Sequence, residues 1–138
     1  MLSISSKCKY GITAVLALAE NYGNGLMQIK EIASIKHIPH QYLGQIFNLL
    51  VNAGTIKSVR GKKGGYELAF EPSEITILNL IEILEGGVQL TSEICDPANA
   101  VDSIFQSTEN KLKDYLKINL SEIILMQQEK NKHMMFHI

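Results

Sequence analysis

One segment of the chain, residues 56–69, limits the fold more than any other. Ile56 to Val59 alternates apolar and polar side chains, which predicts a short strand. The next six residues, Arg60-Gly61-Lys62-Lys63-Gly64-Gly65, combine glycines with cations and are typical of a tight hairpin tip. Tyr66 to Ala69 predicts the returning strand. Any fold proposed for the chain must therefore include a basic β-hairpin.

Three helical patterns precede this hairpin. Apolar residues recur at helical spacing from Ser6 to Tyr22, and they do so again over the short segment from Gln28 to Ile35. A third helix is predicted from about Pro39 to Asn52, because a proline suits the first turn of a helix. Its predicted buried stripe consists of Tyr42, Leu43, Ile46, Leu49, Leu50 and Ala53. Two short helices followed by a basic hairpin define a winged helix-turn-helix.

The second half of the chain predicts further helices. Thr76 to Glu85 carries apolar residues at helical spacing and is followed by a glycine pair that ends the helix. After a loop, apolar positions recur at alternating spacings of four and three residues, which is typical of two helices packed side by side. We interpret this segment as a dimerisation helix with its seam at Val101, Phe105, Thr108, Leu112 and Tyr115. Leu120 to Gln128 is expected to add one or two helical turns.

The expected fold class is therefore mainly α. We expect a winged helix-turn-helix DNA-binding domain with a two-stranded wing over residues 1–87. A loop, a long dimerisation helix and a C-terminal tail are expected over residues 88–138. A chain of 138 residues is long enough for one core with an extension and too short for two ordinary domains.

The formal net charge of −1 hides an uneven distribution of charge. Residues 1–66 carry eight basic and two acidic side chains, a net charge of +6. Residues 67–138 carry five basic and twelve acidic side chains, a net charge of −7. Because cationic surfaces attract nucleic-acid phosphates, the amino-terminal half is the half expected to bind DNA.

The expected DNA contacts come from the third helix and the hairpin. His40, Gln41 and Gln45 face outward in the helical pattern and can hydrogen-bond base edges, with Gln45 suited to adenine. Pro39 and Tyr42 complete this end of the helix, with Tyr42 near the DNA backbone. Glycines at the hairpin tip let its backbone approach phosphates or enter the minor groove. The contacts expected from the hairpin are Arg60, Gly61, Lys62, Lys63, Gly64 and Gly65.

Several other classes of protein fit the sequence poorly. No apolar run approaches the roughly 18 residues that cross a bilayer, and no signal peptide is recognisable. A cytoplasmic location is therefore expected, or the plastid stroma if the gene is organellar.

Two cysteines, Cys8 and Cys95, are too few for a disulfide framework. The four histidines have no nucleophile or carboxylate at motif spacing, so no enzyme activity is expected.

A set of short motifs gives a family resemblance. The most specific is the wing, Ser58-Val59-Arg60-Gly61 through Gly64-Gly65-Tyr66. Others are Ser6-Lys7, Tyr10-Gly11, Glu31-Ile32-Ala33, Ile38-Pro39, Tyr42-Leu43, Gln45-Ile46, Ala53-Gly54, Ile75-Thr76 and Leu84-Glu85-Gly86. With these motifs the chain resembles the Rrf2 (Rrf-two) family of winged-helix transcription regulators. That family includes an iron-sulfur cluster assembly regulator, a nitric-oxide-sensing repressor and a cysteine-metabolism repressor.

The resemblance implies a homodimeric repressor that binds a partly palindromic operator and controls iron-sulfur or cysteine metabolism. It also implies DNA contacts from Arg60, Gln41 and Gln45. Gly44 departs from the family pattern, which often has glutamate there, so one base-discriminating contact is put in doubt. A winged domain that only binds proteins, with its third helix buried, is the alternative function.

Cluster-binding relatives hold an iron-sulfur cluster with three cysteines before the dimerisation helix. Cys95 corresponds to the first of these, but Val101 and Ser107 stand at the other two positions and supply no thiolate. The resemblance therefore implies a broken cluster site, and we expect no cofactor. A site that shares Cys8 of one subunit with Cys95 of the other stays open, beside the alternative of two ordinary free thiols.

The chain end, Met135-Phe136-His137-Ile138, resembles that of the cysteine-metabolism repressor, whose signal arrives through the enzyme cysteine synthase. The resemblance makes Ile138 a candidate anchor, because a free carboxylate can be captured in the substrate pocket of the enzyme. A tail that packs on its own dimer is the alternative that we favour.

Overall fold

Helices make up most of the computed structural model, which describes residues 1–136 of the chain. Three helices come first, α1 (Ser6–Glu20), α2 (Ile29–Lys36) and α3 (His40–Asn52). A hairpin of β1 (Ile56–Val59) and β2 (Gly65–Leu68) follows. The chain continues through a short 3-10 turn η1 (Pro72–Glu74), α4 (Ile77–Glu85), α5 (Ala100–Tyr115) and α6 (Leu120–Phe136). The expected mainly α winged helix-turn-helix is confirmed.

Side-chain caps set the starts of three helices. The hydroxyl of Ser5 accepts the amide hydrogen of Cys8 at 3.1 Å, at the start of α1. The hydroxyl of Thr76 does the same for the Asn79 amide at the start of α4, and the side chain of Asn99 caps α5. The predicted bounds of the first four helices and the two strands lie within two residues of these.

The core joins the first four helices to the hairpin. At Gly11 of α1, a Cβ atom would lie 2.6 Å from the Leu84 side chain, so the absence of a side chain lets α1 approach α4 closely. The predicted stripe of α3 needs two corrections. Phe47, which it left out, is 1% exposed, whereas Ala53, which it included, is exposed at the end of the helix.

The wing is an antiparallel hairpin that contacts Met27, which precedes α2, and Phe47 of α3. Its register runs from Ile56 opposite Leu68 to Val59 opposite Gly65. Met27 extends the sheet, because its amide donates to the Tyr66 carbonyl at 2.9 Å and its carbonyl accepts from the Tyr66 amide at 2.8 Å. The Tyr66 ring also stacks on Phe47 of α3, with ring centroids 4.5 Å apart.

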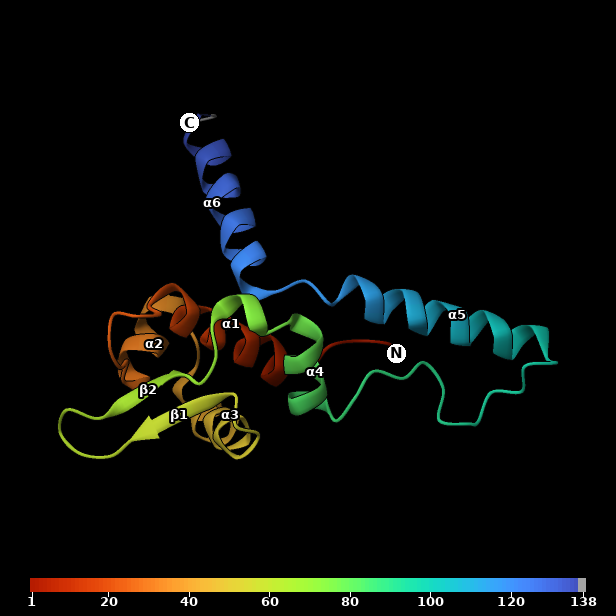
Figure 1. Cartoon of the computed structure of the whole chain (residues 1–138), viewed down its shortest axis with the longest axis horizontal. Coiled ribbons are helices and arrows are strands. Elements are labelled where there is room, and N and C mark those ends of the chain that lie inside the picture. The colour runs from red at the N-terminus through yellow and green to blue at the C-terminus, as the bar shows by residue number, and fades with distance from the viewer. Residues whose placement is uncertain (137–138) are drawn as a thin grey trace.

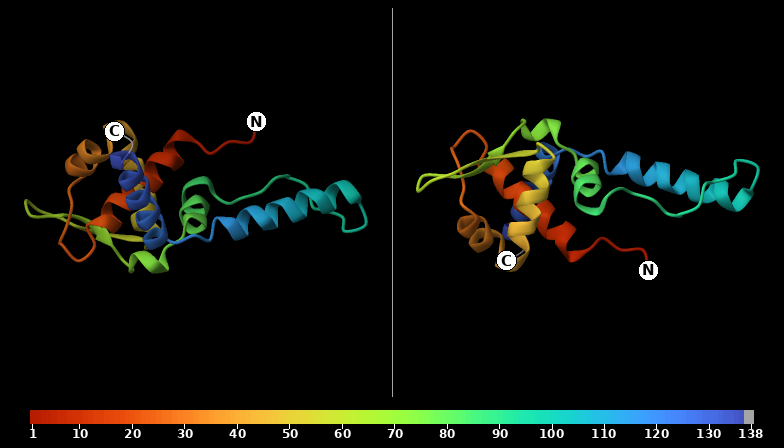
Figure 2. Two further views of the ribbon diagram at one scale, coloured as in Figure 1. Left: turned by 90° about the horizontal axis from the view of Figure 1, so that it is seen from above. Right: turned by 90° about the horizontal axis from the view of Figure 1, so that it is seen from below.

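The second half of the chain forms an arm and a separate helix (Figure 1). The segment 88–99 runs outward from α4, and α5 runs back beside it toward the body. The wing lies at the opposite end of the molecule from this arm (Figure 2). No helix among residues 1–136 is long and apolar enough to cross a membrane.

The chain after α5 is joined to the body by backbone hydrogen bonds. The amide of Leu78 donates to the Leu116 carbonyl at 2.8 Å, and the Leu120 amide donates to the Ile75 carbonyl at 2.9 Å. The Leu120 side chain is fully buried in the core. The expectation of only one or two added turns from Leu120 is wrong, because α6 is a separate helix of 17 residues. Asn119 and Glu122 cap the start of α6, because the backbone amide of each donates to the side chain of the other.

Candidate nucleic-acid interface

The outer face of α3 carries exposed polar side chains. Leu43, Ile46, Phe47 and Leu50 are buried along one side of the helix, which leaves the other side to solvent. The exposed side carries the predicted base-contacting residues His40, Gln41 and Gln45, together with Asn48 and Gly44. No side chain in residues 1–136 covers this face by a hydrogen bond or an ion pair.

The start of α3 is fixed by packing. Pro39 is the N-cap residue, with φ −57°, and it is exposed. Tyr42 is half-buried, and its ring centroid lies 5.2 Å from that of Tyr10 of α1. The Tyr42 ring is therefore held on α1, beside the exposed polar face.

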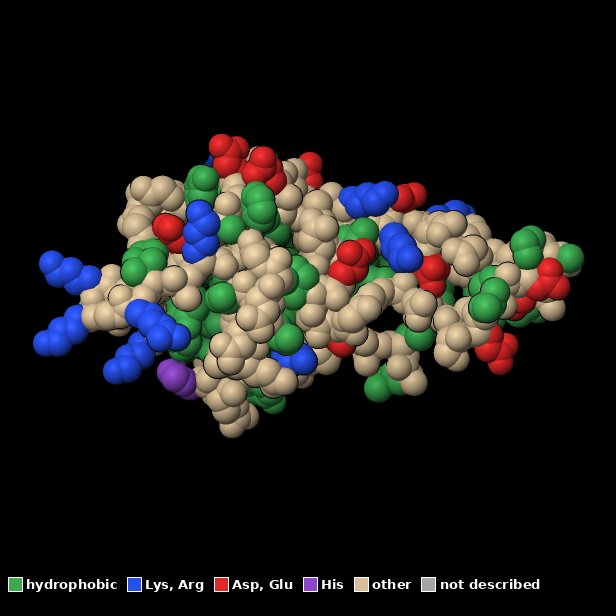
Figure 3. Space-filling view, turned by 60° about the horizontal axis from the view of Figure 1, so that its bottom comes forward, with side chains coloured by type: hydrophobic (Ala, Val, Ile, Leu, Met, Phe, Trp, Pro, Cys, Tyr) green, Lys and Arg blue, Asp and Glu red, His purple; other side chains and the backbone are tan. Residues whose placement is uncertain are grey.

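The tip of the wing carries three cationic side chains. Arg60, Lys62 and Lys63 are exposed, and within the described part of the chain none of them has an ion-pair partner. Figure 3 shows Lys and Arg side chains gathered at the end of the molecule that carries the wing, whereas most acidic side chains lie elsewhere. This separation agrees with the charge division in the sequence.

The glycines shape the tip of the wing. Gly61 has φ +113°, and the Gly64 amide donates to the Gly61 carbonyl at 3.0 Å. At Gly65, φ is +155° and a Cβ atom would lie 2.6 Å from the Met27 carbonyl oxygen. Gly61 needs glycine for its positive φ, and nothing lies within 4 Å of an added Cβ atom there, so its backbone is accessible to a ligand. Gly65 needs glycine because the Met27 backbone occupies the place of a side chain.

Two residues missed in the sequence, Gln28 and Lys30, lie near the wing at the start of α2. The Gln28 side-chain amide donates to the Lys62 carbonyl at 3.4 Å. Gln28 and Lys30 line a cleft of about 340 Å³ together with His40 and the glycines of the wing. The lining of this cleft is mixed, because Ile29, Val59 and Tyr66 add apolar surface beside these polar side chains. The sequence signal that could have pointed to this cleft was a lysine in the first turn of the predicted second helix.

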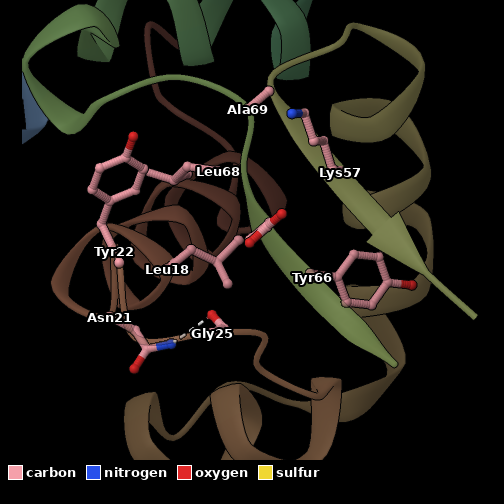
Figure 4. Close-up of a pocket in the computed structure, with 10 residues that line it drawn as sticks. Leu18, Asn21, Tyr22, Gly25, Lys57, Tyr66, Leu68 and Ala69 are labelled. Atoms are coloured by element: carbon pink, nitrogen blue, oxygen red, sulfur yellow. Dashed lines mark hydrogen bonds between the residues drawn. The ribbon is translucent and has the colours of Figure 1, made fainter. Parts of the chain in front are cut away.

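A second cavity lies behind the wing (Figure 4). It has a volume of about 330 Å³, and it lies between the end of α1, the turn after it and the hairpin. The Asn21 side-chain amide closes that turn by donating to the Gly25 carbonyl at 3.1 Å, and the Tyr66 ring points away from the cavity. Its ten lining residues include Lys57, Glu67 and two tyrosines, but no histidine or cysteine.

The predicted dimerisation residues form an exposed apolar stripe on α5. Val101, Phe105, Leu112 and Tyr115 are between 39% and 77% exposed. Ile104, at 63%, belongs to the same stripe and was missed by the seam pattern. Exposed apolar side chains in a row on an otherwise polar helix are typical of an interface.

The two cysteines lie in different surroundings. Cys8 is fully buried in α1, and burial followed by the nearby Glu85 carboxylate raises the pKa of its thiol to about 11. Cys95 lies in the segment before α5, where desolvation and then Asp102 and Glu109 raise its thiol pKa. Among residues 1–136, no group of three or more His, Cys, Asp or Glu side chains could hold a metal ion. Ile138, the candidate anchor, lies outside the described residues.

Comparison with known proteins gives one consistent result. A family model described as Rrf2, iron-dependent transcriptional regulator, matches residues 4–127. The HTH-type transcriptional regulator CymR of Bacillus subtilis (strain 168) is 32% identical over 138 residues, which cover 99% of this chain and 100% of CymR.

Solved structures agree with the sequence comparison. The structure of B. subtilis CymR, described as the global cysteine regulator, is similar with a TM-score of 0.80 and 35% identity, over 89% of this chain and 96% of that one. The structure of T. potens IscR is similar with a TM-score of 0.77 and 30% identity, over 94% of this chain and 90% of that one.

Proposed function

This chain belongs to the Rrf2 family of DNA-binding transcriptional regulators, and from that membership we propose that it acts as a homodimeric repressor of a partly palindromic operator. Its relatives are transcriptional regulators, not enzymes. The observation that carries the proposal is the pairing of an uncovered polar face on α3 with unpaired cations on the wing.

Each element has its own part in operator binding. The α3 helix enters the major groove, where Gln41 and Gln45 hydrogen-bond base edges and so read sequence. Arg60 enters the minor groove at the tip of the wing. Lys62 and Lys63 neutralise phosphates, which adds affinity without reading sequence. Pro39, His40, Tyr42, Gly61, Gly64 and Gly65 shape and complete these two contact regions.

The proposed dimer is formed by α5. Its exposed stripe packs against the same stripe of a second copy, because a two-fold interface pairs one patch with itself. Residues 1–87 then serve as the DNA-binding part and residues 88–138 as the dimerising part, although Leu120 returns to the core of the first. Two copies of α3 would meet successive major grooves about 34 Å apart, which explains a palindromic operator.

We further propose that the regulated genes serve cysteine or sulfur metabolism. The similarity over the whole length of CymR, whose solved structure is described as that of the global cysteine regulator, supports this. A partnership with cysteine synthase through Ile138 remains a prediction, tested by deleting Ile138 and measuring affinity for that enzyme.

The test selects genomic fragments that the purified protein binds and measures affinity by fluorescence anisotropy. Gln45→Ala is expected to lower affinity for the selected operator by about 1–3 kcal/mol while leaving binding to random duplex unchanged. Gln127→Ala on α6 is the matched control and should change neither affinity. Equal loss of specific and random binding in Gln45→Ala would contradict base reading by α3.

A further inference from the structure

The family description names iron, but the residues of this chain do not fit an iron site. Iron sites of the cluster type need thiolate ligands. Of the two cysteines, Cys8 is buried inside its own fold with a raised pKa, and Cys95 is the only one near the arm. No third ligand joins either cysteine within the described part of the chain. Some other interaction must therefore order the segment in which Cys95 lies.

Two carboxylates of α5 hold that segment. The Leu90 amide donates to Glu109 Oε1 at 3.0 Å, near the body. The Asp96 amide donates to Asp102 Oδ2 at 2.9 Å, farther out along the arm. The segment 88–99 and α5 run side by side in opposite directions, so these two bonds join them at both ends of their contact (Figure 1).

Glu109 is itself held in position. Its second oxygen, Oε2, lies 3.4 Å from the Lys113 ammonium and 3.4 Å from the Gln106 side-chain amide. The Glu109 side chain is only 13% exposed. Hydrogen bonding by the Leu90 amide, with smaller effects from Lys113 and Gln106, lowers the pKa of the Glu109 carboxyl, which is therefore ionised at neutral pH. Hydrogen bonds to an ionised acceptor are stronger than those between neutral groups.

Asp102 is placed by the start of α5. Its own amide donates to the Asn99 side chain at 3.2 Å, in the cap of the helix. The segment before it is further tied by Ser103, whose hydroxyl donates to the Pro97 carbonyl at 3.3 Å. The orientation of Asp102 thus depends on residues next to it in the chain and needs no metal ion.

We propose that Asp102 and Glu109 form a carboxylate latch that orders the segment 88–99 on α5, and that this latch lets the protein bind its operator without iron. The second clause rests on the proposed function. Both are positioning residues, because they act on DNA binding only through the arm. The latch holds the segment 88–99 beside α5, the helix whose exposed stripe is the proposed dimer surface.

The test follows the two amides directly by NMR hydrogen exchange in the full chain, purified with a chelator. Glu109→Ala is expected to speed exchange at the Leu90 amide by at least about tenfold. Glu109→Gln should recover part of the protection, since its carbonyl oxygen can accept the same hydrogen bond. Asp114→Ala removes another α5 carboxylate, one that pairs only with exposed Lys117, and should leave Leu90 exchange unchanged.

The second part of the experiment adds iron to the wild type. Anaerobic addition of ferrous iron to the wild type should change neither amide exchange at Leu90 and Asp96 nor affinity for the selected operator. Greater protection or tighter binding with iron overturns the proposal, and so does unchanged Leu90 exchange in Glu109→Ala. A wild type that binds no DNA refutes the proposed function, while the exchange data still decide the latch.

Discussion

Substituting Gly64 by alanine tests how the backbone of the wing tip contributes to DNA binding. An added Cβ atom would lie 2.1 Å from the Val59 carbonyl oxygen and 2.9 Å from the Gly61 carbonyl oxygen, whereas ordinary contact begins at 3.4 Å. Both neighbours are backbone atoms that cannot rotate away, so the tip must move by about 1 Å or more. Overpacking of this kind costs about 1–3 kcal/mol.

The strain is expected to open the tip without unfolding the protein. The tip residues are exposed, and the hydrogen bond from the Gly64 amide to the Gly61 carbonyl is the local interaction that gives way first. Displacing Arg60, Lys62 and Lys63 from the DNA should weaken operator binding at least about tenfold, which corresponds to about 1.4 kcal/mol. Fluorescence anisotropy with a labelled operator measures this loss.

Gly44→Ala makes the same chemical change on the proposed DNA-reading face of α3, so it is a control for protein stability and not for operator affinity. Gly44 is exposed inside the helix, and nothing lies within 4 Å of the added Cβ atom. Alanine is a better helix former by about 1 kcal/mol, so the melting temperature should rise by about 2–4 °C. Wild-type operator affinity in Gly64→Ala would refute the reasoning, as would loss of stability in Gly44→Ala.

Three further predictions follow from the described contacts. Phe47→Ala should lower the free energy of unfolding by about 3–5 kcal/mol, measured by urea denaturation, and a loss below about 1 kcal/mol would contradict its burial. Hydrogen bonds from Ser5 lower the pKa of the Glu85 carboxyl, so Glu85→Gln should be less stable than the wild type at neutral pH. That difference should shrink as the pH falls below the usual value of 4.5, because protonation removes the stabilisation, and a constant difference would be inconsistent with it. In the native protein a thiol reagent should modify Cys95 and spare buried Cys8 until unfolding, whereas equal rates for both thiols would show that Cys8 is accessible.

Helix and strand positions were readable from the sequence because local periodicity determines them. The hairpin was predicted within one residue at each strand, since alternating residues bracket a tip rich in glycine. The burial of Phe47 was readable but missed, because Leu43, Ile46, Phe47 and Leu50 follow the i, i+3, i+4, i+7 spacing of a buried helix face. What the sequence does not show is the stacking of Phe47 on the Tyr66 ring, which needs the folded wing. The length of α6 was hidden by its polar middle, residues 127–132, which shows no apolar period.

The contact residues were only partly predictable, for a related reason. Cations and polar side chains on α3 and the wing have a sequence signature in their charge and order. Gln28 has no such sequence signature, because its hydrogen-bond partner is the backbone carbonyl of a wing residue. The same holds for Glu109, whose acceptor role depends on the Leu90 amide 19 residues away.

The dependence of operator affinity on salt tests most directly whether the protein binds DNA through the cations of its wing. The logarithm of the binding constant should fall linearly with the logarithm of salt concentration. Replacing Lys62 and Lys63 by alanine removes up to four phosphate contacts from a dimer, so the slope should become shallower by about 3–4. An unchanged slope in this double variant, or no salt-sensitive complex with any genomic fragment, would contradict DNA binding through the wing.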